Sequence, residues 1–138
     1  MIFRISTLPR NNIAHIDFTE PYCASLRTCL IAAAANTGID IATAATYGAT
    51  QGPRLETAAE INRMEKDGCH IVGMTGMPEA SIARELGLCY AVIALSVNYA
   101  AGREAGPIEM PAIETALHEG MGDVRSVLAE ALADTLPL

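Results

Sequence analysis

Residues 69–87 read CHIVGMTGMPEASIARELG, in which a short apolar run leads through a glycine-rich turn into a segment that proline opens. The apolar run predicts a strand, and Pro78 followed by Glu79 predicts a helix that Gly87 ends. A turn between a strand and a helix is either an ordinary connection or a place where a ligand binds. A helix start beside the Thr75 hydroxyl can bind an anion, but the residues alone favour Thr75 as the N-cap of an ordinary turn.

The same alternation of strands and helices extends on both sides of this stretch. Short apolar runs that end at turn residues predict strands, and segments with apolar residues at helical spacing predict helices. Helices are expected over residues 21–36, 55–66, 78–86 and 111–132, and strands over residues 39–50, 69–74 and 88–97. The last of these runs, LCYAVIALSV, is apolar throughout, which is typical of a strand buried on both faces. The sequence therefore predicts an α/β domain with a largely parallel sheet.

Three predicted loops follow strands directly, at residues 51–56, 74–79 and 98–102. Ligands in open sheets of this class bind at the carboxyl ends of the strands, so these loops should line one edge of the sheet. The chain has no G-x-G-x-x-G and no G-x-x-x-x-G-K-[ST] motif, so neither a dinucleotide site nor a P-loop is indicated.

The acidic character of the chain narrows the classes of partner. A net charge of -7 and a pI near 4.8 argue against nucleic acid or an anionic membrane as a partner. The longest strongly apolar runs are about ten residues, too short to span a bilayer. The N-terminus has no signal-peptide pattern, so a cytoplasmic protein is expected.

The cysteines and histidines indicate no metal site. The four cysteines are Cys23, Cys29, Cys69 and Cys89. They form no C-x-x-C pair, and free buried thiols are preferred to disulfides or zinc ligands. The three histidines are scattered, without the spacing of metal ligands.

Two polar positions at predicted strand and helix ends have a structural and a functional interpretation. Glu56 and Glu60 are spaced to form a solvated face of a helix, and a carboxylate in a first turn suits the helix dipole. Asn98 ends an apolar strand, where an amide either starts a turn or hydrogen-bonds to the edge of a heterocycle. The residues alone leave both alternatives open.

The segments TQGPRLETAAEINRMEKDG (residues 50–68) and IVGMTGMPEASIARELGLCYAVIALSVNYAAG (residues 71–102) resemble the purine nucleoside phosphorylase and methylthioadenosine phosphorylase family. The shared order is G-P-x-x-E-T-x-A-E, then G-M-[ST]-x-x-P-E, then a strand that ends in Asn or Asp. The match starts near Ile13, so residues 1–12 are interpreted as an unmatched segment and residues 13–138 as the C-terminal part of a phosphorylase domain. The resemblance implies a three-layer fold with a mixed, largely parallel sheet flanked by helices, of which this chain has a part.

The resemblance also implies a role for individual residues. Asn98 is expected to be catalytic, and Thr75 is expected to contact phosphate. The implied substrate contacts are Glu56, Met74, Asn98, Tyr99, Ala100, Ala112 and His15. Met74 corresponds to a ribose contact, and His15 resembles a residue that a neighbouring subunit contributes near the 5′ end of the nucleoside.

These roles fit the chemistry of phosphorolysis, which breaks the bond between ribose C1′ and purine N9. Asn98 can donate to N7 as negative charge develops on the departing ring. Glu56 can accept from N1–H, which a 6-oxopurine has and adenine lacks. Ala112 replaces a polar residue of enzymes that hold a 5′-hydroxyl, and so leaves room for a methylthio group.

The resemblance therefore implies phosphorolysis of S-methyl-5′-thioinosine to hypoxanthine and 5-(methylthio)ribose 1-phosphate, in purine and methylthio salvage. Inorganic phosphate is the expected co-substrate, no cofactor or metal is expected, and the expected assembly is a homotrimer. One alternative is a 6-oxopurine nucleoside phosphorylase that acts on inosine or guanosine. The other is a truncated, non-catalytic remnant that binds purine or pairs with other chains, since the family's glycine-rich phosphate loop and Arg-His pair have no counterpart here.

Overall fold

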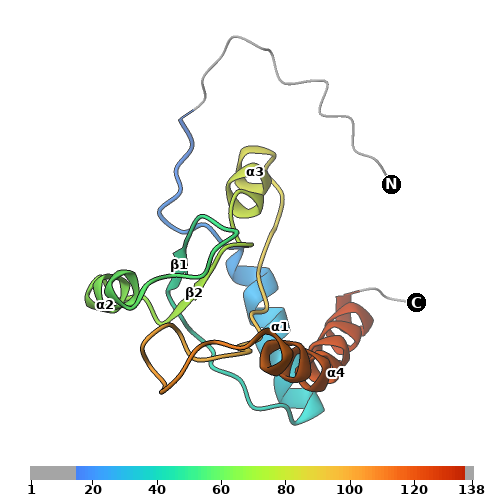
Figure 1. Cartoon of the computed structure of the whole chain (residues 1–138). Helices are drawn as coiled ribbons and strands as arrows, with labels where there is room; N and C mark the ends of the chain where they lie inside the picture. The colour runs from blue at the N-terminus through green and yellow to red at the C-terminus, as the bar shows by residue number, and fades with distance from the viewer. Residues whose placement is uncertain (1–14, 136–138) are drawn as a thin grey trace.

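A computed structural model describes residues 15–135, so the predicted unmatched segment 1–12 lies outside the described residues. In chain order the elements are α1 (Ala24–Thr37), β1 (Tyr47–Ala49), α2 (Ala58–Lys66), β2 (Ile71–Gly73), α3 (Glu79–Glu85) and α4 (Met110–Thr135). Figure 1 shows α2 on one side of the two strands and α1 with α4 on the opposite side. Strands alternate with helices around a parallel sheet, and the predicted α/β class is confirmed.

The strands β1 and β2 pair in parallel, with Tyr47 opposite Ile71 and Ala49 opposite Gly73. Parallel strands need a crossover, which α2 provides. The backbone N–H of Thr50 donates to the Gly73 carbonyl at 2.9 Å, just beyond the paired residues. The loops after β1 and β2 therefore lie at the same edge of the sheet, as the sequence predicts.

The helices α1 and α4 pack against each other through small side chains. The buried members of this contact are Ala33, Ala34, Val127 and Ala131. Alanine carries no atoms beyond Cβ, so the two backbones approach closely. At the edge of the contact, Asn36 Nδ2 donates to Glu130 Oε1 at 3.0 Å.

Two helices begin later than the sequence predicts, and their caps explain the difference. α1 begins at Ala24 instead of residue 21, with Cys23 in an extended conformation before it. α2 begins at Ala58 instead of residue 55, because the Thr57 side chain accepts from the backbone N–H of Glu60 and so fixes the first turn. α1 ends at Thr37, one residue after the predicted end, and Gly38 follows it as expected, with a φ of 71° that glycine adopts without strain.

Two of the predicted strands are shorter than expected and the third is not formed. The predicted strand 39–50 is reduced to Tyr47–Ala49 and the strand 69–74 to Ile71–Gly73, and residues 88–97 form no strand among the described residues. An apolar run supplies the tendency to form a strand, but a strand also needs a neighbour to hydrogen-bond with. Residues 91–97 have no such neighbour in the part of the chain that the structure describes.

The prediction of free thiols is wrong for two of the cysteines. Cys23 and Cys89 form a disulfide, with their Cα atoms 5.1 Å apart. The cause is the docking of the start of α1 on the segment after α3, where the Cys23 N–H donates to the Tyr90 carbonyl at 2.8 Å. Cys29 and Cys69 are free and half-buried.

Few large apolar side chains are buried among the described residues. The buried hydrophobic residues are Ala33, Ala34, Ile61, Met64, Ala80, Ala83, Val127 and Ala131. Larger side chains stay outside this core: Leu88 and Leu132 are each 60% exposed. None of the described helices is long and apolar enough to cross a membrane.

Two glycines inside α4 give a matched test of this packing. A Cβ on Gly120 would lie 2.6 Å from Leu95 Cδ1, whereas nothing lies within 4 Å of the Cβ position on Gly122. Gly122→Ala should stabilise the protein by about 0.5–1 kcal/mol through helix propensity. Gly120→Ala should gain less, because Leu95 must move. Urea unfolding measures both, and an equal gain for the two variants would contradict the contact.

Candidate functional site

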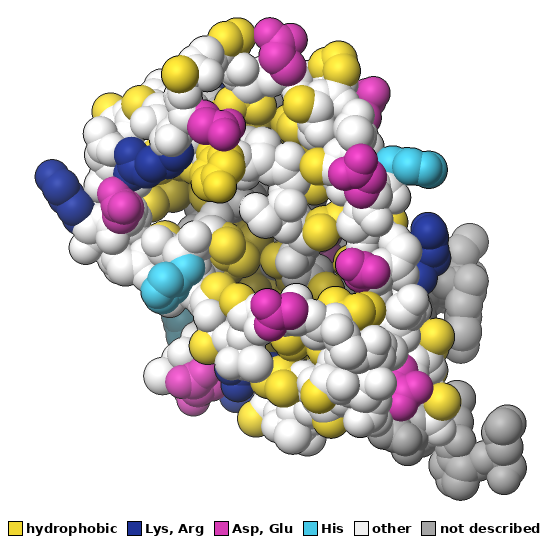
Figure 2. All heavy atoms as spheres, turned by 90° about the horizontal axis from the view of Figure 1, so that it is seen from below, with side chains coloured by type: hydrophobic (Ala, Val, Ile, Leu, Met, Phe, Trp, Pro, Cys, Tyr) yellow, Lys and Arg dark blue, Asp and Glu magenta, His cyan; other side chains and the backbone are white. Residues whose placement is uncertain are grey.

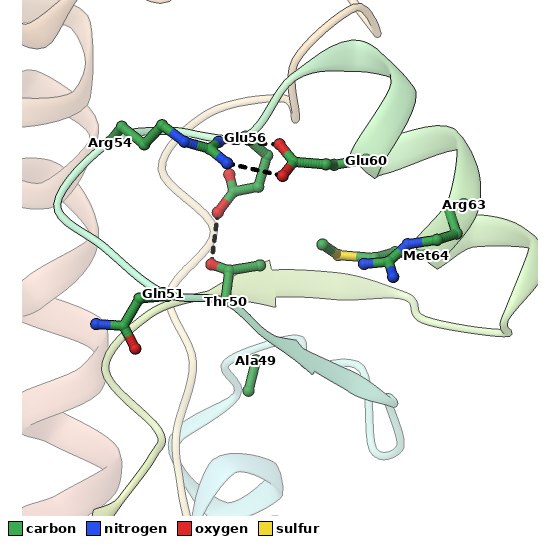
Figure 3. A pocket seen from close by; sticks show the side chains of 8 residues that line it. All are labelled: Ala49, Thr50, Gln51, Arg54, Glu56, Glu60, Arg63 and Met64. Carbon is green, nitrogen blue, oxygen red and sulfur yellow. Dashed lines mark hydrogen bonds and ion pairs between the residues drawn. The ribbon is translucent and has the colours of Figure 1, made fainter.

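A cavity of about 220 Å³ lies where β1 ends and α2 begins. Its lining residues are Ala49, Thr50, Gln51, Arg54, Glu56, Glu60, Arg63 and Met64. Figure 3 shows that they come from the end of β1, the connecting loop and one face of α2. The cavity thus lies at the carboxyl end of a strand, where the sequence predicts a ligand.

Glu56 is held in this cavity by a short hydrogen bond. Thr50 Oγ1 donates to Glu56 Oε1 at 2.6 Å and also lies 3.3 Å from the Gly73 carbonyl. The bond crosses the loop from the end of β1 to the residue before the α2 cap, as Figure 3 shows. Glu56 Oε2 makes no hydrogen bond to any described residue. The carboxylate is therefore oriented and keeps one oxygen available as an acceptor.

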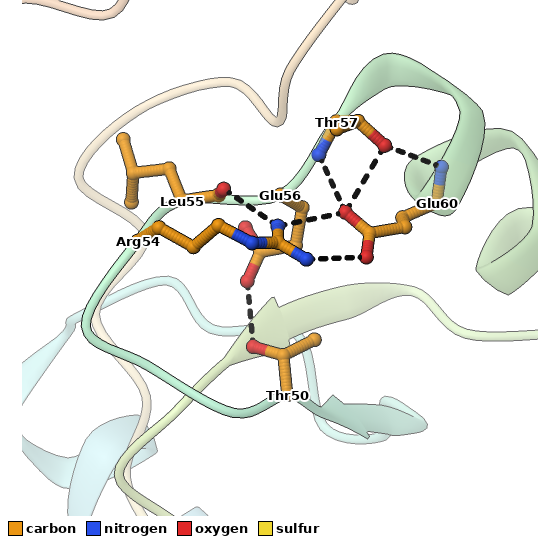
Figure 4. Close-up of polar contacts among 6 residues, drawn as sticks. All are labelled: Thr50, Arg54, Leu55, Glu56, Thr57 and Glu60. Carbon is orange, nitrogen blue, oxygen red and sulfur yellow. Dashed lines mark hydrogen bonds and ion pairs between the residues drawn. The ribbon is translucent and has the colours of Figure 1, made fainter.

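The start of α2 is organised by a network around Glu60, drawn in Figure 4. Arg54 reaches the two Glu60 oxygens through Nη1 and Nη2, at 2.9 and 2.8 Å. Glu60 Oε2 also accepts from the Thr57 N–H at 2.7 Å, which completes a capping box with Thr57. The predicted helix face formed by Glu56 and Glu60 is wrong, because Glu56 lies before α2 and each carboxylate has a different partner.

This network perturbs the acidity of its members. The hydrogen bonds from Arg54, and then those from Thr57, lower the pKa of Glu60 from 4.5 to about 2. The same contact with Glu60 raises the pKa of Arg54. Both side chains stay charged near neutral pH, so the cavity wall carries a neutral pair beside Glu56.

The loop 74–79 differs from the anion site that the sequence allowed. The backbone N–H groups of Thr75 and Gly76 donate to Tyr47 Oη, at 3.3 and 3.2 Å. The Tyr47 side chain lies against Gly73 and Gly76: a Cβ on Gly73 would collide with it, and a Cβ on Gly76 would crowd its ring. Two amides that an anion would use are thus occupied by a phenol.

Thr75 is not the helix cap either. α3 begins at Glu79, its N-cap is Pro78, and no side chain caps it. Thr75 is exposed, and its hydroxyl makes no hydrogen bond to a described residue. Met74 is half-buried, with its sulfur against Gly52 in the loop after β1.

A second cavity, of about 140 Å³, lies beside the loop that Asn98 begins. Four predicted contact residues line it together: Asn98, Tyr99, Ala100 and Ala112. Asn98 Nδ2 donates to the Tyr99 carbonyl at 2.7 Å, which fixes the amide in the loop. The group carries a second N–H, so a donor remains for a ligand.

The loop that Asn98 begins also contacts α2, the helix that lines part of the first cavity. Arg103 donates to Asn62 Oδ1 at 2.8 Å and pairs with Glu65 Oε2 at 2.6 Å. A Cβ on Gly102 would lie 2.7 Å from Ala58 Cβ, so the loop touches the first turn of α2. Glu56 lies two residues before that turn, so the loop that borders the second cavity touches the helix whose start borders the first.

The structure therefore places some of the predicted site residues in the two cavities and leaves others outside them. Glu56 lines the first cavity and four others line the second, whereas Met74, Thr75 and His15 line neither. His15 is exposed at the start of the described residues. Sequence reasoning missed Thr50, Arg54 and Tyr47, although the pattern T-x-x-E over residues 57–60 signals the capping box around which Arg54 folds. Over residues 15–135, no group of three or more His, Cys, Asp or Glu could hold a metal ion.

Comparisons with known proteins identify related chains. Residues 3–133 match the model of the Phosphorylase superfamily. A Pseudomonas syringae protein named probable S-methyl-5′-thioinosine phosphorylase is 55% identical over 121 residues, 88% of this chain and 49% of its own length. The 6-oxopurine nucleoside phosphorylase of Pyrococcus furiosus is 42% identical over 89% of this chain and 46% of its own.

A solved structure agrees with these relatives. The adenosine/methylthioadenosine phosphorylase of Schistosoma mansoni, as a double mutant in complex with adenine, superposes with a TM-score of 0.84 at 28% identity. The match covers 88% of this chain and 49% of that one. The chain thus spans about half the length of the relatives it matches.

The Glu60 network predicts an acid-dependent loss of stability. The pKa of Glu60 is lower in the folded protein than its ordinary value of 4.5. Its contribution is therefore present above pH 4.5 and is lost as the pH falls toward 2. Glu60→Gln should reduce the drop in urea midpoint between pH 6 and pH 3. Glu85→Gln is the control, since Glu85 makes no ion pair among the described residues. An unchanged drop in Glu60→Gln would contradict the network.

Proposed function

The chain belongs to the phosphorylase superfamily, and on that premise we propose that it serves the phosphorolysis of S-methyl-5′-thioinosine to hypoxanthine and 5-(methylthio)ribose 1-phosphate. The observation that carries the proposal is the 55% identity to a probable phosphorylase for this nucleoside over 88% of the chain. The reaction transfers a pentosyl group to inorganic phosphate, as expected for salvage of a purine nucleoside.

In this proposal Glu56 selects the base. Its Oε1 is fixed by Thr50, and its Oε2 stays available to accept a hydrogen bond from a ring nitrogen that carries a proton. A 6-oxopurine presents N1–H to such an acceptor, whereas adenine presents a lone pair at N1. A site that needs this hydrogen bond rejects the ligand that lacks it more strongly than a pocket shaped only for size.

Asn98 assists the departure of the base. Cleavage of the bond from C1′ to N9 leaves negative charge on the purine ring. An amide N–H aimed at N7 stabilises that charge more than it stabilises the neutral nucleoside, so it lowers the barrier. The bond from Asn98 to the Tyr99 carbonyl favours this role, because a fixed donor needs no reorganisation during the reaction.

The remaining contacts concern the sugar and phosphate. Ala112 lines the second cavity and offers a small apolar wall for a methylthio group. Met74 is assigned to the ribose and the free Thr75 hydroxyl to phosphate. A neighbouring subunit of a homotrimer would bring His15 to the 5′ end, and we propose the cytoplasm as the compartment.

A second candidate is a 6-oxopurine nucleoside phosphorylase that uses inosine or guanosine. The relative from Pyrococcus furiosus, at 42% identity, favours it. The two candidates share the base contacts and differ at the 5′ position. A comparison of kcat/KM for inosine and methylthioinosine separates them, and a preference for inosine would favour the second.

Phosphate-dependent release of hypoxanthine from methylthioinosine, followed by its absorbance, tests the proposal directly. The chain should release hypoxanthine only when phosphate is present, and Thr75→Val should reduce the rate. If the unmodified chain released hypoxanthine no faster than the Thr75→Val variant, the proposal that this chain is active would be overturned. Calorimetric binding of hypoxanthine without turnover would instead support the non-catalytic remnant.

Asn98→Ala tests the proposed leaving-group donor. Loss of one such donor costs about 10²- to 10³-fold in kcat. KM should change much less, because the donor acts mainly on the transition state. Asn36→Ala, in α1 and away from both cavities, is the matched control and should keep kcat within twofold. A fall in Asn98→Ala that appears only in KM would refute the assignment.

A further inference from the structure

We infer that Arg103 is a positioning residue that holds the Asn98 amide at a fixed place relative to Glu56. The inference rests on the proposed function, in which Asn98 donates to purine N7 and Glu56 accepts from N1–H. These two nitrogens belong to the two fused rings of a rigid base. One base can therefore engage both groups in the transition state only if the spacing between them is held constant.

The Arg103 guanidinium bonds to α2 at two points. Its Nη1 donates to Asn62 Oδ1 at 2.8 Å, and its Nη2 pairs with Glu65 Oε2 at 2.6 Å. Two hydrogen bonds from a planar guanidinium to two different side chains fix both the position and the orientation of the group. The Arg103 side chain is 30% exposed. The contact thus restrains the loop that carries Arg103 in direction as well as in distance.

A backbone contact extends the same attachment. Gly102 has a φ of 76° and lies so close to the first turn of α2 that a Cβ on it would come within 2.7 Å of Ala58 Cβ. Ala58, Asn62 and Glu65 are spaced at helical intervals, so they lie on one face of α2. Figure 1 shows the loop, in orange, reaching from the side of α4 toward α2. Gly102 and Arg103 therefore dock together along one side of this helix.

The link from Arg103 back to Asn98 is short. The Arg103 N–H donates to the Ala100 carbonyl at 3.0 Å, which closes a turn, and Asn98 Nδ2 donates to the Tyr99 carbonyl at 2.7 Å. On the other side of Asn98, residues 91–97 make no backbone hydrogen bond to a described residue. Among the described residues, the hydrogen bonds that join this loop to another element are therefore those of Arg103.

The helix α2 relates this attachment to Glu56. Glu56 directly precedes Thr57, whose side chain caps α2. Ile61 and Met64 of the same helix are buried, which keeps α2 in place against the rest of the chain. α2 thus acts as a rigid spacer, with Glu56 fixed before its first turn and the loop that Asn98 begins fixed along its side.

Arg103→Met tests this positioning in the full chain. The variant keeps an apolar stem and loses the guanidinium, so Asn98 is present but less well oriented. Its kcat for methylthioinosine should fall by about tenfold, less than the loss expected for Asn98→Ala, while KM should change by less than about twofold. The urea midpoint should stay nearly unchanged, because an exposed ion pair contributes little to stability. An unchanged kcat, or a fall in kcat that only accompanies a fall in the urea midpoint, would overturn the inference.

A second measurement needs no turnover. In nuclear magnetic resonance spectra of the chain without substrate, the side-chain amide signal of Asn98 should shift and broaden in Arg103→Met. Hydrogen exchange at residues 99–103 should quicken by about tenfold, as the loop opens more often. If the unmodified chain shows no turnover, the proposed function fails for this chain, and these two readouts still decide whether Arg103 positions Asn98. An Asn98 signal that is the same in both proteins would overturn the inference.

A charge exchange ties the effect to the contact with α2. Arg103→Glu and Glu65→Arg should each lower kcat, and the double variant should recover most of the loss, because the ion pair forms again with its ends reversed. The chain carries a net charge of -7, and Figure 2 shows Asp and Glu spread over one face with few Lys or Arg, so Arg103→Glu also adds general repulsion. Arg125→Glu in α4 is the matched control and should leave kcat unchanged, since the Arg125 side chain is exposed and bonds to no described residue. A double variant no more active than its two single variants would overturn the inference.

Discussion

The contact of α1 with α4 through alanine is the interaction on which the rest of the described structure depends. Ala33 and Ala34 are completely buried in it. It holds Ile93, and with it the extended stretch that leads to Asn98. Because the side chains are small, the two helices approach closely but bury little apolar area. A larger residue introduced there would meet a neighbour that cannot move away. The fold is thus anchored by shape complementarity over a limited surface.

The candidate site is organised by a different principle. Around α2, polar side chains fix the loops: Thr50 orients Glu56, and Arg54 and Thr57 share Glu60. Charged groups that bond to backbone and to one another at a helix start give directional restraint where little apolar area is available. A site built in this way has its polar groups positioned by the same turn that starts the helix.

The sequence predicted what local patterns encode. The helices, the two paired strands and the shared edge of their loops follow from spacing, proline and glycine. The prediction of a strand at residues 88–97 failed because a strand needs a neighbour to pair with. The pattern of apolar residues within the run carries no information about that neighbour. The Cys23–Cys89 disulfide was not predicted for the same reason, since it joins residues that are 66 apart in the sequence. Tyr47 was missed because its hydroxyl meets Thr75 only through the register of β1 with β2.

The disulfide closes a ring within the described chain and leaves the segments before Cys23 and after Cys89 outside it. The ring from Cys23 to Cys89 contains α1, both strands, α2 and α3, whereas α4 lies outside it. Chain-entropy arguments assign a cross-link of this span about 4 kcal/mol of stabilisation through the unfolded state. Topologically, one backbone cut anywhere inside the ring leaves the two pieces covalently joined. The Thr50, Glu56 and Thr75 loops would therefore stay on one molecule after such a cut, while a cut between Cys89 and α4 would release α4 as a separate piece.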